Sequence, residues 1–263
     1  MTFQPVVPAS GLVGWQFLQR TYDAQFEAFK SSFRLQDNTE YFLENIKDVT
    51  SAAQLVEDRR LLEVALGAFG LQDDINNKYF IQVILQEGTT DDEALANKLT
   101  DERYAEFSKA FGFGPGELQY TSFTVNMGAV ADNYLLESFE RSVGDQDDTM
   151  RIALYGQREM AELAEDPMSE EAKWFTVLGQ PPLRELFRTA LGLPQSFGQV
   201  DIEKQAEIFR ERAQSVLGTS DLSEFSDEGL REKLITIYHA RAQIDSFAAG
   251  SSSNAIALTL LRS

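Results

Sequence analysis

Large apolar residues recur every three or four positions along most of the chain, which is the period of an α-helix with one buried face. The longest such stripe lies near the N-terminus and extends over about five turns. It consists of Trp15, Leu18, Tyr22, Phe26, Phe29 and Phe33. The pattern predicts a core-facing helix that begins at Gly14. Residues 1–14 carry no charged side chain and contain two prolines, and we expect an extended arm there.

Polar residues that suit helix caps separate the following apolar stripes. Asp37 is predicted to cap a second helix, and Thr50 or Ser51 a third. In the second half of the chain, Pro181 and Pro182 suit the first turn of a helix, where missing N–H donors cost little. Helices are expected there near residues 119–143, 148–165, 169–178, 182–192, 201–217 and 227–247.

Three segments of the first half match three segments of the second half in the same order. Residues 26–45 and 136–155 align without gaps and are identical at six of 20 positions. The other two pairs are 59–71 with 181–193, and 99–107 with 225–233. The offsets place insertions in the second copy near 156–180 and 195–224. An all-α protein with two tandem, internally duplicated multi-helix units is therefore predicted.

The segment FGFGPGE at residues 111–117 is rich in glycine and cannot continue a helix, so a boundary between the two units is predicted there. Its glycine spacing does not match a phosphate-binding loop. The chain is therefore predicted to consist of an N-terminal arm (1–14), a first unit (15–113), a linker (114–118), a second unit (119–247) and a C-terminal tail (248–263).

Composition and charge narrow the functional classes. Apolar residues make up 43% of the chain, and proline is scarce, which favours a helical core. The formal net charge of −19 argues against nucleic acid and anionic membrane surfaces as partners. No stretch reaches the roughly 18–20 apolar residues of a membrane-spanning helix, so no membrane insertion is expected. The N-terminus does not resemble a secretory signal peptide.

Residues with catalytic or metal-binding chemistry are sparse. The chain has no cysteine, which excludes disulfides, thiolate metal sites and cysteine nucleophiles. His239 is the single histidine, and no G-x-S-x-G turn presents a serine to it. A calcium loop begun at Asp145 fails, because Met150 and Gly156 stand where glycine and glutamate are needed. We therefore predict no enzyme activity and no catalytic, cofactor-binding or metal-binding residue.

Acidic pairs are better explained by helix starts than by chemistry, since carboxylates stabilise the positive end of a helix. This applies to Asp147 or Asp148 in the acidic run 145–148. It also applies to the pairs Asp91/Asp92, Glu170/Glu171 and Asp227/Glu228.

The C-terminal end combines a small-residue stretch with an apolar one. AAGSSS at 248–253 predicts a flexible linker, and NAIALTLLRS follows it. The apolar end either folds back on the protein or contacts a partner or another subunit. The candidate interaction residues are Ile256, Leu258, Leu260 and Leu261.

Several long phrases resemble a domain-of-unknown-function family of alphaproteobacteria. They are FQPVVPASGLVGWQFLQRTYDAQFEAF, DRRLLEVALGAFGL, TDERYAEFSKAFGF and LRELFRTALGLPQSFGQVDIEKQAEIF, and they span nearly the full chain. The resemblance implies a helical protein without an established enzymatic activity, encoded beside flagellar genes. It supplies no catalytic residues.

Together these features predict a non-enzymatic interaction or accessory protein in flagellar assembly or motility, located in the cytoplasm and without a cofactor. The acidic charge favours a protein partner that is basic or flagellar. One alternative is an exported or structural component of the flagellum, since a cysteine-free chain also suits export. Another is a small-molecule binder or enzyme that uses a groove between the repeats. The oligomeric state stays open.

Overall fold

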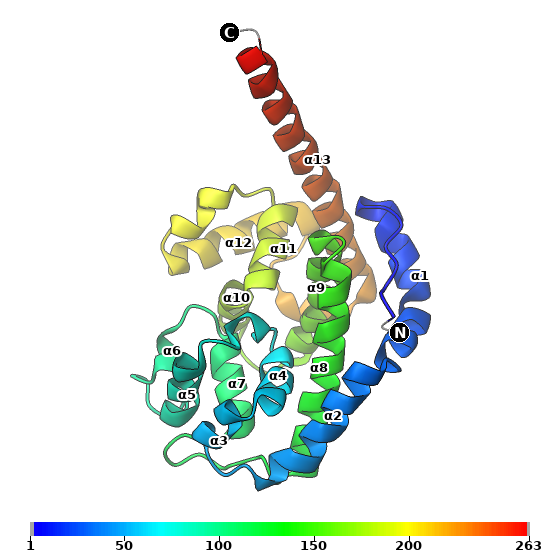
Figure 1. The fold of residues 1–263 in the computed structure, drawn as a ribbon. Helices are drawn as coiled ribbons and strands as arrows, with labels where there is room; N and C mark the ends of the chain where they lie inside the picture. The colour runs from blue at the N-terminus through cyan, green and yellow to red at the C-terminus, as the bar shows by residue number, and fades with distance from the viewer. Residues whose placement is uncertain (1–2, 262–263) are drawn as a thin grey trace. The chain divides into compact units, whose positions relative to one another are not determined.

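The computed structural model describes the backbone of residues 3–261 and the side chains of residues 3–247. This part of the chain is built from α-helices, short 3-10 helices and turns, and contains no β-strand (Figure 1). The prediction of an all-α protein is confirmed.

Thirteen α-helices occur within the described residues. They are α1 (Gly11–Lys30), α2 (Phe33–Asn45), α3 (Ala52–Glu57), α4 (Arg59–Gly67), α5 (Lys78–Glu87), α6 (Leu95–Lys98), α7 (Arg103–Phe111), α8 (Thr124–Gly144), α9 (Asp148–Glu165), α10 (Glu170–Gly179), α11 (Pro181–Ala190), α12 (Ile202–Leu217) and α13 (Glu228–Leu261). The 3-10 helices are η1 (Ile46–Asp48), η2 (Gln72–Asp74), η3 (Gln195–Gln199) and η4 (Leu222–Ser226).

The chain divides into two compact units. Unit 1 comprises residues 1–6 and 21–145, and unit 2 comprises residues 7–20 and 146–263. Helix α1 therefore contributes its first half to unit 2 and its second half to unit 1. This division differs from the predicted boundary at 114–118, which lies inside unit 1.

The glycine-rich segment stays within unit 1 because it packs against the end of α5. A Cβ atom on Gly114 would lie 2.4 Å from the Cα atom of Gly88, so only glycine allows this approach. Glu117 accepts hydrogen bonds from the backbone N–H groups of Thr89 (2.6 Å) and Gly114 (3.1 Å). Helix α8 then packs on α2 and α4, which places it in unit 1 as well.

Aromatic side chains form much of the core of unit 1. The ring of Phe139 on α8 meets Tyr22, Phe26 and Phe29 of α1 edge-on, at centroid distances of 5.4–5.5 Å. Such edge-to-face pairs add to the hydrophobic stabilisation of the buried rings. The apolar stripe predicted for the first helix therefore faces a core along this half of α1.

Unit 2 is organised around α9, α10, α11 and α13. Helix α9 packs on α11, α13 and η4, while α10 packs on α11 and α12. Trp174, Phe187, Phe209 and Phe225 form an aromatic cluster of fully buried side chains. This cluster connects α10, α11, α12 and η4.

The predicted end of the first helix and the predicted cap of the second helix were both wrong. Helix α1 ends at Lys30, and α2 begins at Phe33, so the apolar stripe breaks and Phe33 is 80% exposed. Asp37 lies inside α2 and does not cap it; its carboxylate instead forms an ion pair of 2.5 Å with Arg60. In the second half, Asp147 caps α9 as predicted, accepting a hydrogen bond of 3.0 Å from the backbone of Thr149.

The second pair of matched segments ends its helices in the same way. Gly70 after α4 and Gly192 after α11 have φ angles of +65° and +69°. In both cases, the N–H of the next residue donates 2.9 Å back to the carbonyl five residues earlier, from Leu71 to Leu66 and from Leu193 to Arg188. These are Schellman-type helix ends, which require a left-handed residue. The internal duplication itself stays a prediction.

Helix α13 continues through residues 248–253 to Leu261, so the backbone is helical where a linker was predicted. Helices α9, α11 and α12 and the 3-10 helix η4 pack against α13. The side chains of Ile256, Leu258, Leu260 and Leu261 lie outside the described residues, and their role in interactions stays a prediction.

Candidate functional site: an acidic groove between α10 and α12

Two helices of unit 2 form the walls of the site. Helix α10 begins after Ser169, whose hydroxyl accepts a hydrogen bond of 3.2 Å from the backbone of Ala172. Helix α12 begins after Asp201, whose carboxylate accepts one of 3.0 Å from Glu203. Both starts follow the usual chemistry of helix caps, which fixes the orientation of the first turns.

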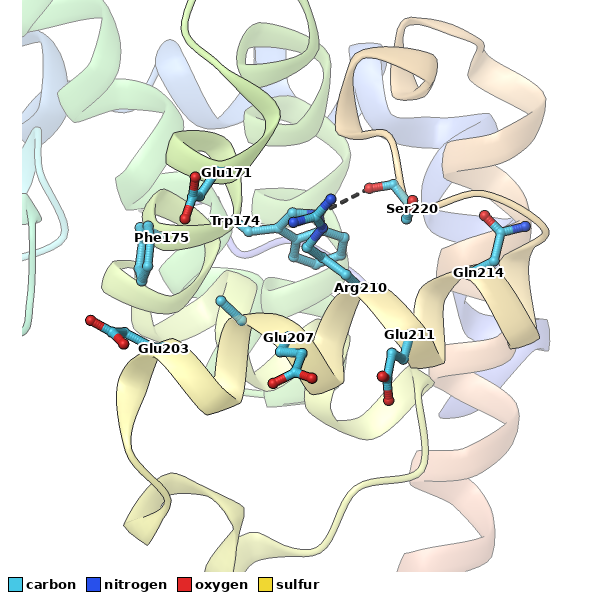
Figure 2. Close-up of a pocket in the computed structure, with 10 residues that line it drawn as sticks. Glu171, Trp174, Phe175, Glu203, Glu207, Arg210, Glu211, Gln214 and Ser220 are labelled. Carbon is cyan, nitrogen blue, oxygen red and sulfur yellow. Dashed lines mark hydrogen bonds between the residues drawn. The ribbon is translucent and has the colours of Figure 1, made fainter.

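An open groove of about 680 Å³ lies along these helices (Figure 2). Its lining combines carboxylates, aromatic rings and single basic and amide side chains. The lining residues are Glu171, Trp174, Phe175, Glu203, Ala206, Glu207, Arg210, Glu211, Gln214 and Ser220.

Carboxylates follow the α12 side of the groove at regular intervals. Glu203, Glu207 and Glu211 are four residues apart, so they share one face of the helix (Figure 2). At a rise of 1.5 Å per residue, they extend over about 12 Å. Glu171 adds a fourth carboxylate from α10. The groove therefore has a row of negative charge along one wall and a further charge on the other.

One of these carboxylates has a basic neighbour on the same helix. Lys204 forms an ion pair of 2.5 Å with Glu207, and both side chains are more than half exposed. Exposed pairs of this kind contribute at most about 1 kcal/mol. Lys204 therefore holds Glu207 only weakly.

The floor of the groove is apolar and held in place by the core. Trp174 has no exposed surface, and its indole N–H donates a hydrogen bond of 2.9 Å to the carbonyl of Ser220 (Figure 2). Its ring contacts Phe187 at 5.3 Å and Phe209 at 6.0 Å. Phe175, the next residue, is half-buried and available at the surface of the groove.

A buried lysine secures the loop that carries Ser220. Lys173 donates hydrogen bonds to the carbonyl of Ala164 (2.9 Å) and to Ser223 Oγ (2.7 Å), and its ammonium lies 3.8 Å from Glu170. Glu170 in turn accepts hydrogen bonds from the backbone N–H groups of Leu222 (2.5 Å) and Ser223 (3.2 Å). Residues 220–223 are thus fixed to the start of α10.

These hydrogen bonds also set the ionisation of Glu170. Burial alone raises the pKa of its carboxyl group, but hydrogen bonds from Ser223 and Leu222 and the charge of Lys173 outweigh burial and lower the pKa. Glu170 therefore stays ionised as the counter-charge of the buried ammonium. It has a supporting role, whereas its neighbour Glu171 faces the groove.

The single histidine lies elsewhere in unit 2 and is 1% exposed. The ring of His239 packs between Trp15 at 5.4 Å and Tyr238 at 5.3 Å. Neither ring nitrogen has a hydrogen-bond partner among the described residues. Burial lowers the pKa of His239 to about 4, although the charge of Asp147 acts in the opposite direction. Burial also disfavours the charged form of Tyr238 and therefore raises the pKa of its hydroxyl.

The acidic run 145–148 supplies a helix cap in the structure. Within the described residues, no group of three or more acidic or histidine side chains is arranged to hold a metal ion. The structure instead shows a row of carboxylates on α12, a helix whose glutamates were not predicted to form a site. The signal was present, because glutamates recur every four residues within the predicted helix 201–217. Glu171, Trp174 and Phe175 lie in the predicted insertion at 156–180.

Comparison with known proteins places the chain in a family. A family model described as "Protein of unknown function (DUF1217)" matches residues 68–230, which is more than half of the chain. The chain belongs to the DUF1217 family. The matched region contains every residue that lines the groove. No curated protein matches the chain.

The fold of this DUF1217 protein also resembles a solved structure. The X-ray crystal structure of protein AGR_C_984 from Agrobacterium tumefaciens is similar to it, with a TM-score of 0.67 and 26% sequence identity. The similarity covers 89% of this chain and 97% of the Agrobacterium protein. The predicted resemblance to a family of unknown function is therefore confirmed. The expected link to flagellar genes stays a prediction.

Among the helices of the described chain, none combines the length and the apolar character needed to cross a membrane.

Proposed function

We propose that this DUF1217 protein is a non-enzymatic interaction protein that holds a segment of a partner protein in the α10–α12 groove. The observation that carries this proposal is the composition of the groove, in which exposed charges surround an apolar floor. Protein interfaces have the same arrangement, with an aromatic or aliphatic centre and a polar rim.

The size of the groove is consistent with this function. A volume of about 680 Å³ has room for several side chains of an occupant. Because the groove is open to solvent, an occupant can extend beyond it. That geometry suits a segment of a longer chain.

Flagellar assembly or motility is the cellular process that we propose for this interaction. Its support is the family resemblance of the long phrases in the sequence, which implies genes beside flagellar genes. The high negative charge of the chain supports a basic partner.

Site-specific photo-crosslinking in living cells tests the proposal. A photoreactive amino acid at Gln214, which is exposed and lines the groove, is expected to yield a specific covalent adduct with another protein. The matched control carries the same group at Glu40, which is exposed on α2 in unit 1. Equal adducts at both positions, or none at Gln214, would show that the groove does not hold a partner.

A deletion strain tests the proposed process separately. Loss of the gene is expected to reduce swimming in soft agar, and the intact gene is expected to restore it. Normal flagella and normal swimming in the deletion strain would remove the flagellar assignment, whatever the crosslinking result.

A further inference from the structure

The spacing of charges in the α10–α12 groove limits what its occupant can be. Glu203, Glu207 and Glu211 place carboxylates about 6 Å apart along one face of α12. Basic side chains four residues apart on a second helix have the same interval, since both helices rise by 1.5 Å per residue. The row of acids on α12 thus matches a row of basic residues on a helix laid beside it.

The apolar floor adds a second requirement. Phe175 is half-buried and follows Trp174, which has no exposed surface, so Phe175 supplies the accessible apolar area of the floor. A polar backbone lying on this ring would lose hydration without gaining a partner. An aliphatic side chain on the same helix, next to its basic row, would cover Phe175 and complete the interface. Amphipathic helices bind hydrophobic grooves of other proteins in this way.

We propose that the groove between α10 and α12 binds an amphipathic helix of a partner protein that carries lysine or arginine every four residues beside an apolar face. This inference rests on the proposed function and specifies the chemistry of the partner. The helix lies along α12, with its basic residues paired to Glu203, Glu207 and Glu211. Its apolar residues contact Phe175.

Arg210 is the basic residue among those that line the groove. Its substitution should change the affinity for a basic helix in the direction opposite to substitution of the glutamates. Its side chain is exposed on α12, and it forms no ion pair with the described residues. A positive charge at this place repels a basic helix and favours partners whose charges avoid it. Removal of Arg210 should therefore tighten the binding of a basic helix, whereas removal of the glutamates should weaken it.

A synthetic helical peptide is the probe for this inference. It carries three lysines at four-residue spacing and leucines on the adjacent face, and its control peptide has glutamine in place of each lysine. Fluorescence anisotropy with the full-length protein measures both. We expect the lysine peptide to bind more tightly and to lose affinity as salt is raised from 50 to 300 mM, because exposed charges are then screened.

Two triple variants separate the groove from the general acidity of the protein. Glu203→Gln/Glu207→Gln/Glu211→Gln removes the row of acids on α12. The control, Glu40→Gln/Glu44→Gln/Glu57→Gln, removes three exposed helical acids of unit 1 and changes the net charge of −19 by the same amount. We expect the groove variant to bind the lysine peptide about tenfold more weakly, and the control to change affinity less than about twofold.

Single substitutions test the other two features of the groove. Arg210→Ala is expected to tighten the lysine peptide about threefold, and Phe175→Ala to weaken it about fivefold. Circular dichroism of every variant checks that the helices are intact. Equal effects of both triple variants, or equal affinity for the lysine and glutamine peptides, would overturn the inference. Displacement by spermidine at matched charge, with no effect of Phe175→Ala, would also overturn it.

The outcomes for the inference and for the proposed function are distinguishable. A crosslinked partner at Gln214 whose captured segment is neutral or acidic would end the inference but leave the proposed function standing. No crosslinked partner at Gln214 would end the proposed function itself.

Discussion

Replacement of His239 by leucine should change how the stability of unit 2 depends on pH. His239 is buried without a hydrogen-bond partner among the described residues, and its pKa is lowered to about 4. In the unfolded chain, its pKa is close to the ordinary value of about 6.5. The neutral form is therefore favoured by folding, and protonation favours the unfolded state.

The sign and the size follow from this difference in pKa. The stabilising contribution is fully present above pH 6.5 and is lost as the pH falls toward 4, because the unfolded state then binds the proton more tightly. A difference of about 2.5 pKa units corresponds to about 3 kcal/mol in total. About 2 kcal/mol of this is lost between pH 7.5 and pH 5. Asp147 is the charged group that opposes the shift, and Trp15 and Tyr238 supply the apolar contacts.

Urea unfolding followed by tryptophan fluorescence measures this effect selectively. Trp15 and Trp174 are the two tryptophans of the chain, and both belong to unit 2. With a single histidine in the chain, His239 is the side chain that ordinarily titrates between pH 5 and 7. Wild-type protein should lose about 2 kcal/mol of unfolding free energy from pH 7.5 to 5, and His239→Leu much less. Parallel losses in both proteins would refute the reasoning.

Three further substitutions test local features by urea unfolding. Gly192→Ala should lower the free energy of unfolding by at least about 1–2 kcal/mol, because φ is +69° and the new Cβ would lie 1.9 Å from Arg241 Nη1. The control Gly198→Ala, with open space around it, should cost less. Equal losses of stability would contradict this account. Asp147→Ala should cost about 1 kcal/mol of stability, because α9 loses its cap. Asp37→Ala removes only an exposed ion pair and should cost less than about 0.5 kcal/mol. A larger loss for Asp37→Ala would argue against its place inside α2. Glu170→Gln should cost about 2–3 kcal/mol of stability, since it leaves the buried Lys173 without its counter-charge. Glu171→Gln is the matched control and should change stability little. Equal effects of the two substitutions would contradict the supporting role of Glu170.

Sequence periodicity predicted the helical class and several helix starts, because these depend on local interactions. Pro181 begins α11, Ser51 caps α3 and Asp147 caps α9, all as expected. The start of α2 was not predictable in this way. The apolar stripe that ends at Phe33 continues through a real helix break, and only packing shows that Phe33 is exposed.

The aligned segments 26–45 and 136–155 show the same limit. In the first, the chain breaks between α1 and α2 at residues 31–32; in the second, it breaks between α8 and α9 at residues 145–147. The alignment would place these two breaks about four residues apart. Identical residues such as Asp37 and Asp147 consequently have different structural roles. Sequence identity alone does not determine which residue ends a helix.

The groove could not be predicted from the sequence for another reason. Glu203, Glu207 and Glu211 are ordinary surface residues of a helix until α10 supplies the opposite wall and Trp174 the floor. That arrangement depends on contacts between segments about 30 residues apart. Helical spacing can identify a row of charge, whereas only the tertiary fold shows that the row borders a hollow.

The division of α1 between the two units has a consequence for protein synthesis. Trp15 emerges early from the ribosome, yet its partner His239 lies near the other end of the chain. At about 5–20 residues per second, Trp15 waits roughly 10–45 s for His239 to be translated. Unit 1, whose residues end at 145, can fold meanwhile. Through this interval, the first half of α1 is an unburied apolar segment on a nascent chain, the kind of surface that makes chaperones necessary.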